Sequence, residues 1–221
     1  NKPSKASHEF KDTVDGNKTY YSSLAFDGLG AGEKVNNQQS RWVSDRKKLP
    51  GNVMNPDYND DHYIQVDLGD FYDISKVVLS WEGAGASEYK LQVSLDGENW
   101  KDIEHITDGK GGIKESIFED ELIARYVKMK GIKAGSDYGY SLWEFEVYGE
   151  KAEAPQENIA LNKPSKASSE YTNPYSNFLL ESKYAFDGSV EDRGNSYQSR
   201  WVSHRQKDYP GEDVNSQWLQ V

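Results

Sequence analysis

Residues 63–68 read Tyr-Ile-Gln-Val-Asp-Leu, a stretch in which apolar side chains alternate with polar ones. Successive side chains of a β-strand point to opposite faces, so this alternation places Ile64, Val66 and Leu68 on one face. The stretch therefore predicts a strand with one face on a core and the other in water. Such half-buried strands are typical of antiparallel sheets.

Other β-rich segments follow along the chain, and turn-forming residues separate them. These segments cover residues 76–81, 89–94, 124–129 and 142–148. In the last segment, the alternation predicts that Trp143, Phe145 and Val147 share the buried face. No segment shows a sustained helical period. Many short strands separated by turns predict an all-β fold, specifically an antiparallel jelly-roll β-sandwich.

The same motifs occur twice in the chain and in the same order. Asn1-Lys-Pro-Ser-Lys-Ala-Ser7 recurs unchanged at residues 162–168, and residues 63–66 correspond to Trp218-Leu-Gln-Val221. A spacing of about 160 residues is too long for a solenoid repeat, so each copy is predicted to be a domain.

We therefore predict a complete first domain at residues 1–150, a linker at residues 151–157 and the N-terminal part of a second, incomplete copy at residues 158–221. The linker is charged, contains Ala and Pro, and lacks β-branched residues. Most of the predicted strands have no counterpart in the second copy. We expect that copy to be a truncation product, to be poorly ordered alone, or to be completed by residues outside this sequence.

Charge and composition limit the function of the chain. Its 221 residues carry 37 acidic and 26 basic side chains, which gives a formal net charge of −11. An acidic surface repels phosphate groups, which argues against nucleic acid and anionic lipid as partners. The absence of cysteine excludes disulfide scaffolds, thiol catalysis and thiolate metal sites. The sequence also lacks a hydrophobic run of transmembrane length.

The sequence contains no catalytic motif that we can identify. A glycosidase needs two carboxylates in a cleft, and a thin sandwich predicts no such cleft. A nucleophile elbow, a catalytic triad, a phosphate loop and a zinc motif are all missing. His62 follows two aspartates but has no partner at helical spacing, and we interpret the four histidines as surface residues. We therefore predict that the chain is not an enzyme.

The ordered motifs resemble the discoidin, or coagulation-factor type C, domain family. The resemblance rests on these segments in this order: Asn1–Ser7, Ala25–Gly28, Ser40–Trp42, Ile64–Gly69, Tyr89–Gly97, Trp100, Ala124–Val127 and Trp143–Gly149. Residues 81–89 and 138–143 are most similar to the bacterial branch, the family 32 carbohydrate-binding modules. The resemblance implies an eight-stranded jelly roll that accompanies a glycan-processing enzyme in a secreted or cell-surface protein of bacterial origin.

The resemblance also implies a structural calcium site. At the positions that match the family's ligands, this chain has the carbonyl of Ala25, the carboxylate of Asp27, the hydroxyl of Ser40 and the carboxylate of Glu144. Calcium takes oxygen ligands of these three kinds. Glu144 lies within a predicted strand, an unusual place for a free carboxylate. The loop between Asp27 and Ser40 is longer than is usual in the family, so its carbonyl ligands are not assigned.

Loop residues, rather than the tryptophans, are the candidate sugar ligands. All six tryptophans lie in strand-like motifs, and we expect most of them in the core. A sugar needs an exposed flat ring and polar groups for its hydroxyls. Tyr138 is the favoured ring, whereas Tyr140 is equally well explained as a cap on the sandwich edge. The candidate sugar site comprises Glu9, Asp45, Arg46, Glu82, Tyr138 and Tyr140.

The predicted ligand is a glycan built from neutral or amino sugars, and an amino sugar or another cationic glycan becomes plausible if the carboxylates dominate the site. We expect a monomeric module within a larger multidomain protein. The alternative is an adhesion-type discoidin domain that binds protein or lipid surfaces. Membrane binding needs exposed apolar loops and a basic belt. The loops at residues 47–51 and 55–60 are polar and of mixed charge, which disfavours lipid and leaves adhesion to a glycoprotein open.

Overall fold

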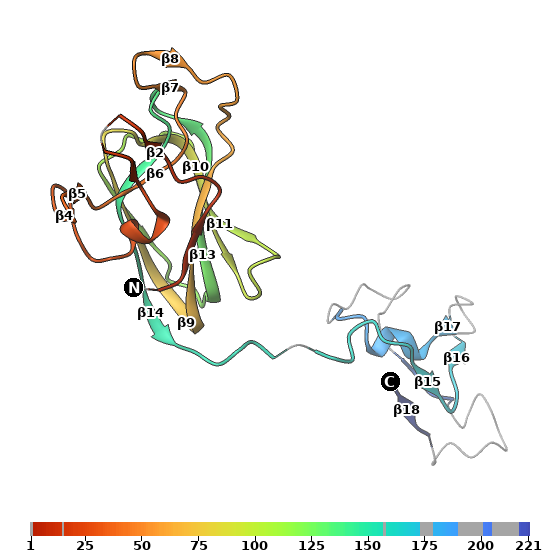
Figure 1. The fold of residues 1–221 in the computed structure, drawn as a ribbon. Helices are drawn as coiled ribbons and strands as arrows, with labels where there is room; N and C mark the ends of the chain where they lie inside the picture. Colours follow the sequence, from red (N-terminus) through yellow and green to blue (C-terminus); the bar gives the residue numbers. More distant parts are fainter. Residues whose placement is uncertain (1, 15, 157, 173–178, 190–200, 205–216) are drawn as a thin grey trace. The chain divides into compact units, whose positions relative to one another are not determined.

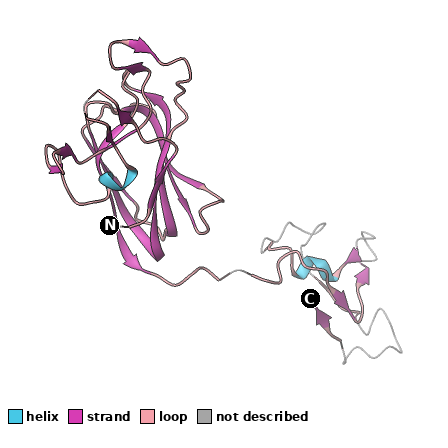
Figure 2. Cartoon of the chain, viewed as in Figure 1, coloured by secondary structure: helices cyan, strands magenta, loops and turns pink. Residues whose placement is uncertain are grey.

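The computed structural model describes residues 2–14, 16–156, 158–172, 179–189, 201–204 and 217–221. The chain divides into two compact units, Asn1–Pro155 and Gln156–Val221. Almost all regular structure in the described residues is β, as Figure 2 shows. The exceptions are the 3-10 helices η1 (Ser22–Ala25) and η2 (Ser182–Ala185). Two predicted features, the last linker residue Glu157 and the start of the repeated motif at residues 199–203, lie outside the described residues.

The first unit is built on one continuous set of antiparallel strands. The strands of this set are β1 (Ser4–Ala6), β6 (Trp42–Val43), β9 (Tyr63–Trp81), β10 (Ala86–Ser94), β11 (Lys101–Ile106), β12 (Ile113–Ile117), β13 (Ile123–Ala134) and β14 (Ser141–Lys151). Their order is β11-β10-β13-β9-β14-β6, and β1 and β12 also pair with β9. The short hairpins are β2 (Lys11–Asp12) with β3 (Lys18–Thr19), β4 (Lys34–Val35) with β5 (Gln38–Gln39), and β7 (Lys48–Leu49) with β8 (Val53–Met54).

Strand β9 belongs to both layers of the sandwich (Figure 1). Its first half pairs with β1 and β13, and its second half pairs with β12 and β14. The sequence predicts separate strands at residues 63–68 and 76–81, whereas the structure joins them into one. Gly69 has a φ of 81°, which side chains rarely tolerate. This glycine therefore allows the backbone to bend where the strand passes from one layer to the other.

The core lies between the two layers, and the predicted face of the opening stretch contributes to it. Ile64, Val66 and Leu68 are all buried, which confirms the alternation. The larger fully buried side chains are Trp42, Ile64, Ile74, Leu79, Tyr89, Leu91, Met129, Tyr140, Leu142 and Phe145. The structure therefore confirms the predicted all-β antiparallel sandwich.

Two predictions about buried residues are wrong or only partly right. His62 was predicted on the surface, but it is buried beside Tyr58 and Tyr140. Of the tryptophans of the first unit, Trp42 and Trp81 are buried in the core, whereas Trp100 and Trp143 are half-buried. Loop packing buries His62, and an alternation pattern does not report on loop packing.

The described part of the second unit contains short strand pairs and η2. The pairs are β15 (Lys166–Ala167) with β18 (Leu219–Gln220), and β16 (Tyr171–Thr172) with β17 (Leu179–Leu180). Local contacts of the first unit recur here. The Ser182 N–H donates to Glu170 at 2.7 Å, as the Ser22 N–H donates to Glu9. That this unit is an incomplete copy stays a prediction.

Candidate functional site

An open pocket of about 410 Å³ lies where three loop segments of the first unit meet. The segments flank β6, connect β9 to β10, and precede β14. The lining residues are Arg41, Val43, Arg46, Glu82, Gly83, Ala84, Tyr138 and Ser141. Backbone hydrogen bonds hold these segments together: the Glu82 N–H donates to the Ser141 carbonyl at 2.9 Å, and the Ser141 N–H donates to Ala84 at 2.8 Å. These hydrogen bonds between the end of β9 and the start of β14 therefore hold the backbone of the pocket in place.

Arg41 and Glu82 form an ion pair inside this pocket. Nη1 of Arg41 lies 3.0 Å from Oε1 of Glu82, and the arginine side chain is largely buried. Its guanidinium also lies over the rings of Tyr20 and Trp143, with distances of 5.0 and 5.3 Å to the ring centroids. The second oxygen of Glu82 accepts a hydrogen bond from the Ala84 N–H. Both charges of this pair are therefore compensated and held in place.

Arg46 lines the same pocket without such a pair. Its guanidinium carbon lies 4.0 Å from the ring centroid of Phe10. Burial, followed by the charge of Arg41, lowers the pKa of Arg46 below its usual value. Within the described part of the chain, no carboxylate lies within ion-pair distance of its guanidinium. Arg46 is thus a cation that is held against the ring of Phe10, and its Nε has no hydrogen-bond partner.

Unpaired polar atoms concentrate at this pocket. In the described residues, six buried side-chain polar atoms lack a hydrogen-bond partner, and three of them belong to pocket residues. They are Nε of Arg41, Nε of Arg46 and Oγ of Ser141. A buried donor or acceptor without a partner costs free energy, so such atoms mark places where a ligand or water can bind.

Tyr138 supplies an exposed aromatic ring at the rim of the pocket. Its side chain is 53% exposed. The following residue, Gly139, has a φ of 71°, and an added Cβ would collide with the carbonyl oxygen of Asp45. The tight turn at Gly139 therefore sets the position of Tyr138, where a sugar ring could stack on its face.

The structure brings three predicted sugar ligands together, namely Arg46, Glu82 and Tyr138. The other two predicted carboxylates make structural hydrogen bonds. Glu9 accepts from the Ser22 N–H at 2.7 Å, at the start of η1. Asp45 accepts from the Arg46 N–H and from the side chain of Asn55, both at 2.8 Å.

Tyr140 is a core residue, so its prediction as a sugar ligand is wrong. Its side chain is completely buried, and its hydroxyl donates to the Asp60 carbonyl at 2.9 Å. Its ring packs on Gly131, where an added Cβ would lie 2.5 Å from the ring. The absence of a side chain at Gly131 thus makes room for this tyrosine inside the sandwich.

Two pocket residues with polar side chains, Arg41 and Ser141, were missed from the sequence. Arg41 lies within the repeated Ser-Arg-Trp motif, and this repetition could have drawn attention to it. Ser141 has no comparable signal, because its position in the pocket depends on the pairing of β14 with β6.

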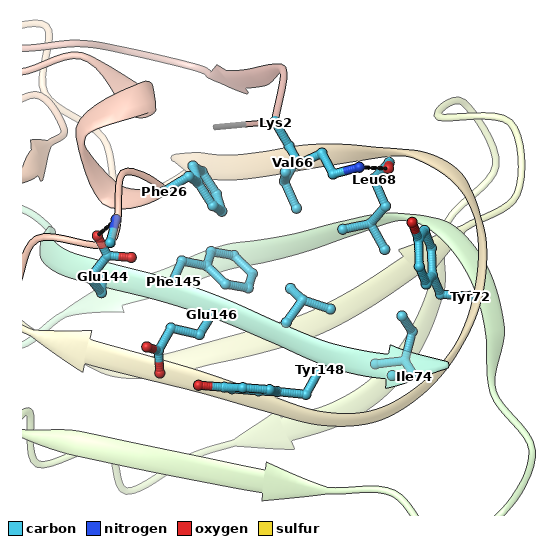
Figure 3. Close-up of a pocket in the computed structure, with 13 residues that line it drawn as sticks. Lys2, Phe26, Val66, Leu68, Tyr72, Ile74, Glu144, Phe145, Glu146 and Tyr148 are labelled. Carbon is cyan, nitrogen blue, oxygen red and sulfur yellow. Dashed lines mark hydrogen bonds between the residues drawn. The ribbon is translucent and has the colours of Figure 1, made fainter. Parts of the chain in front are cut away.

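The predicted calcium ligands form a second cluster. The Ser40 hydroxyl donates to the Asp27 carboxylate. Glu144 accepts hydrogen bonds from the N–H groups of Gly28 at 2.8 Å and of Leu29 at 3.0 Å, and Figure 3 shows the Glu144 side chain directed at this loop. Burial, followed by a hydrogen bond with Asp27, raises the pKa of Glu144 to about 7.

This cluster fits a hard cation. Two carboxyl groups share a mostly buried place, which requires either a bound proton or a cation to balance the charge. Asp27, Ser40 and Glu144 provide carboxylate and hydroxyl oxygens, the ligands that calcium takes. Ala25 ends η1 two residues before Asp27 and is fully buried. A group of three or more His, Cys, Asp or Glu is not found among the described residues, so carbonyls would supply the remaining ligands.

A second open pocket of about 400 Å³ lies beside this cluster, between the layers of the sandwich (Figure 3). It is lined mainly by apolar side chains, including those of Phe26, Leu68, Ile74 and Phe145. A sugar needs polar partners for its hydroxyls, so the pocket between Arg46 and Tyr138 fits a sugar better.

In the parts of the chain that the structure describes, no helix has the length and hydrophobicity needed to cross a membrane.

Comparisons with solved structures identify bacterial binding modules. Chitosan-binding module 1 of a chitosanase/glucanase from Paenibacillus sp. IK-5 is 36% identical, with a TM-score of 0.52, and the match covers 67% of this chain and 96% of that module. Module 2 of the same enzyme, solved with chitotriose, is 32% identical with a TM-score of 0.52; that match covers 67% and 97% of the two chains. These relatives are binding modules and not catalytic domains, in agreement with the predicted non-catalytic role.

A curated relative is the polysaccharide lyase 8 family protein HylA of Enterococcus faecalis, which is 29% identical over 150 residues. The match covers 61% of this chain, and the chain spans 10% of the length of that relative. The family model described as F5/8 type C domain matches residues 9–145, which is more than half of the sequence. The chain therefore belongs to the F5/8 type C domain family.

Proposed function

We propose that the first unit is a non-catalytic carbohydrate-binding module that holds a sugar in the pocket between Arg46 and Tyr138. The observation that carries the proposal is the exposed ring of Tyr138 beside three buried polar atoms without partners. An aromatic face binds the C–H surface of a sugar, and the unpaired donors bind its hydroxyls. The similarity to modules that bind chitosan supports the proposal.

A glycan array probed with the full chain tests this proposal. We expect binding to a defined set of glycans and its loss in Tyr138→Ala. Tyr148→Ala is the matched control, because Tyr148 is 44% exposed but does not line this pocket. Both variants should keep the melting temperature of the parent chain. Binding to a protein or to liposomes without binding to any glycan would instead favour the adhesion-type alternative.

We also propose that a structural calcium binds to Ala25, Asp27, Ser40 and Glu144. The ion would balance the two carboxylates and join the loop after η1 to strand β14. The carboxyl pair formed by Asp27 and Glu144 supports this assignment.

The wider role follows from the class of relatives. We propose that the module belongs to a secreted or cell-surface bacterial protein and keeps a glycan-active enzyme close to its substrate. Single sugar sites bind weakly, because sugar hydroxyls exchange water for protein at little net gain. A second module on the same chain would raise avidity through effective concentration.

A further inference from the structure

We infer that the pocket between Arg46 and Tyr138 selects an acidic sugar, whose carboxylate pairs with Arg46 beside Arg41. The inference rests on the proposed function, since it names the class of sugar that the same pocket takes.

The charges that line the pocket favour an anion. Arg41 and Arg46 are its two cations, and Glu82 is its one anion. Glu82 is already paired with Arg41 at 3.0 Å, so the charge of Arg46 is not balanced by a contact. From the sequence, an amino sugar or another cationic glycan is plausible on the condition that carboxylates dominate the site. That condition fails, because Glu9 and Asp45 bind backbone and side-chain donors elsewhere.

A cationic sugar would add a third positive group to this pocket. Burial, and after it repulsion from the Arg41 guanidinium, lowers the pKa of Arg46, against the opposing charges of Asp12 and Glu82. An anion would relieve the repulsion, whereas an ammonium group would increase it. The positive pocket is also a local exception in a chain of net charge −11.

The geometry of Arg46 suits a carboxylate. The guanidinium is held over the ring of Phe10 at 4.0 Å, and its buried Nε lacks a partner. A planar guanidinium presents donors in a fork that matches the two oxygens of a carboxylate. Nε of Arg41 and Oγ of Ser141 then remain for hydroxyl groups, and the ring of Tyr138 remains for the sugar face.

A matched pair of ligands tests the inference with the full chain. We would measure affinities by calorimetry for uronic-acid oligosaccharides of several configurations, each beside its carboxyl-reduced counterpart, which differs only in the missing carboxylate. A charge-assisted hydrogen bond predicts that at least one acidic ligand binds about 10-fold or more tightly than its reduced form. Glucosamine oligosaccharides provide the cationic comparison and should bind more weakly than the acidic ligand.

Variants locate the effect at Arg46. In Arg46→Gln, the preference for the acidic ligand should fall to about 2-fold or less, since a charged donor pair is lost. Arg46→Lys should restore part of it, because it keeps the charge without the planar fork. Lys76→Gln is the control, because Lys76 lies over Tyr148 and away from the pocket. If Arg46→Gln fails to fold, the affinities of the parent chain for the acidic ligand and its carboxyl-reduced form still test whether the pocket prefers an acidic sugar.

Two results would overturn the inference and are distinguishable. If neutral or amino sugars bind through Tyr138 and the acidic ligands bind no better than their reduced forms, the acidic preference is wrong while the proposed function stands. If no sugar of any class binds, the proposed function fails and the inference fails with it.

Discussion

Tyr138 and Tyr140 are separated by one glycine, and their side chains lie in opposite environments. Tyr138 is 53% exposed at the rim of the pocket, whereas Tyr140 is completely buried. The difference arises from the partners of Tyr140. Its hydroxyl donates to the Asp60 carbonyl at 2.9 Å, its N–H donates to Ser44 Oγ at 2.9 Å, and its ring packs on Gly131.

The contact between Gly131 and Tyr140 leads to a prediction for stability. In Gly131→Ala, the added methyl group would lie 2.5 Å from the tyrosine ring. We expect a loss of about 1–3 kcal/mol in the free energy of unfolding, as for other overpacked cores. Urea denaturation measures the loss. Gly83→Ala is the control, because an added Cβ there meets nothing within 4 Å. Equal stability of the two variants would contradict this packing.

His62 leads to a prediction for pH. Burial lowers its pKa, against the opposing charges of Asp45, Asp60 and Asp61 and with a smaller contribution from His8. In the unfolded chain this histidine takes up a proton near pH 6.5, whereas in the folded chain it takes one up only at a lower pH, because its pKa is lowered. Its contribution to stability is therefore present above pH 6.5 and is lost as the pH falls below that value.

Denaturation of the parent chain and of His62→Gln on both sides of pH 6.5 tests this expectation. The parent should lose more stability on acidification than the variant, because glutamine does not titrate. Parallel pH profiles of the two proteins would show that His62 is not the group responsible.

At the scale of the element, strand β14 shows how one bulge distributes four neighbouring side chains. The register with β9 shifts between Leu142 and Glu144. As a result, Leu142 and Phe145 enter the core, Glu144 faces the Asp27 loop, and Trp143 contacts Arg41. The simple alternation placed Trp143 with Phe145 on the buried face. That prediction is wrong, because the bulge breaks the two-residue period.

The bulge predicts different outcomes for substitutions two residues apart. Phe145→Ala should lower the free energy of unfolding by about 3–5 kcal/mol, as for other buried aromatic residues. Trp143→Ala should cost less, since its ring is half-buried, but should weaken sugar binding because Arg41 loses its ring contact. Urea denaturation and calorimetric titration with the best glycan separate the two effects. An equal loss of stability in both variants would argue against the bulged register.

At the scale of the whole molecule, the proposed calcium site links parts of the first unit that are far apart in sequence. Glu144 receives its hydrogen bonds from Gly28 and Leu29, 116 and 115 residues away. A ligand that binds only the folded state stabilises it, by about 2.7 kcal/mol at a concentration 100-fold above its dissociation constant.

We therefore expect a chelator to lower the melting temperature of the parent chain and added calcium to restore it. Glu144→Gln removes one carboxylate, so its melting temperature should respond little to chelator or calcium. Differential scanning calorimetry of the two proteins provides the measurement. A parent melting temperature that chelator does not change would count against the site.

The sequence by itself determined the fold class and named three residues that line the proposed sugar pocket. The alternation at residues 63–68 predicts a buried face from local geometry alone, and the structure confirms it. Arg46, Glu82 and Tyr138 were also chosen from the sequence, because loops that follow strand ends tend to meet at one rim. These inferences depend on residues that are close in sequence or on the order of motifs.

Only the tertiary structure decided which charges remain free at that rim. Nothing local in the sequence shows that Glu9 binds the Ser22 N–H, that Asp45 binds Asn55, or that Arg41 pairs with Glu82. The pair of Arg41 and Glu82 joins segments 41 residues apart in sequence, which come together only when the sheet forms. Side-chain charge is a property of the residue, but the balance of charge in a pocket depends on which neighbours the fold supplies.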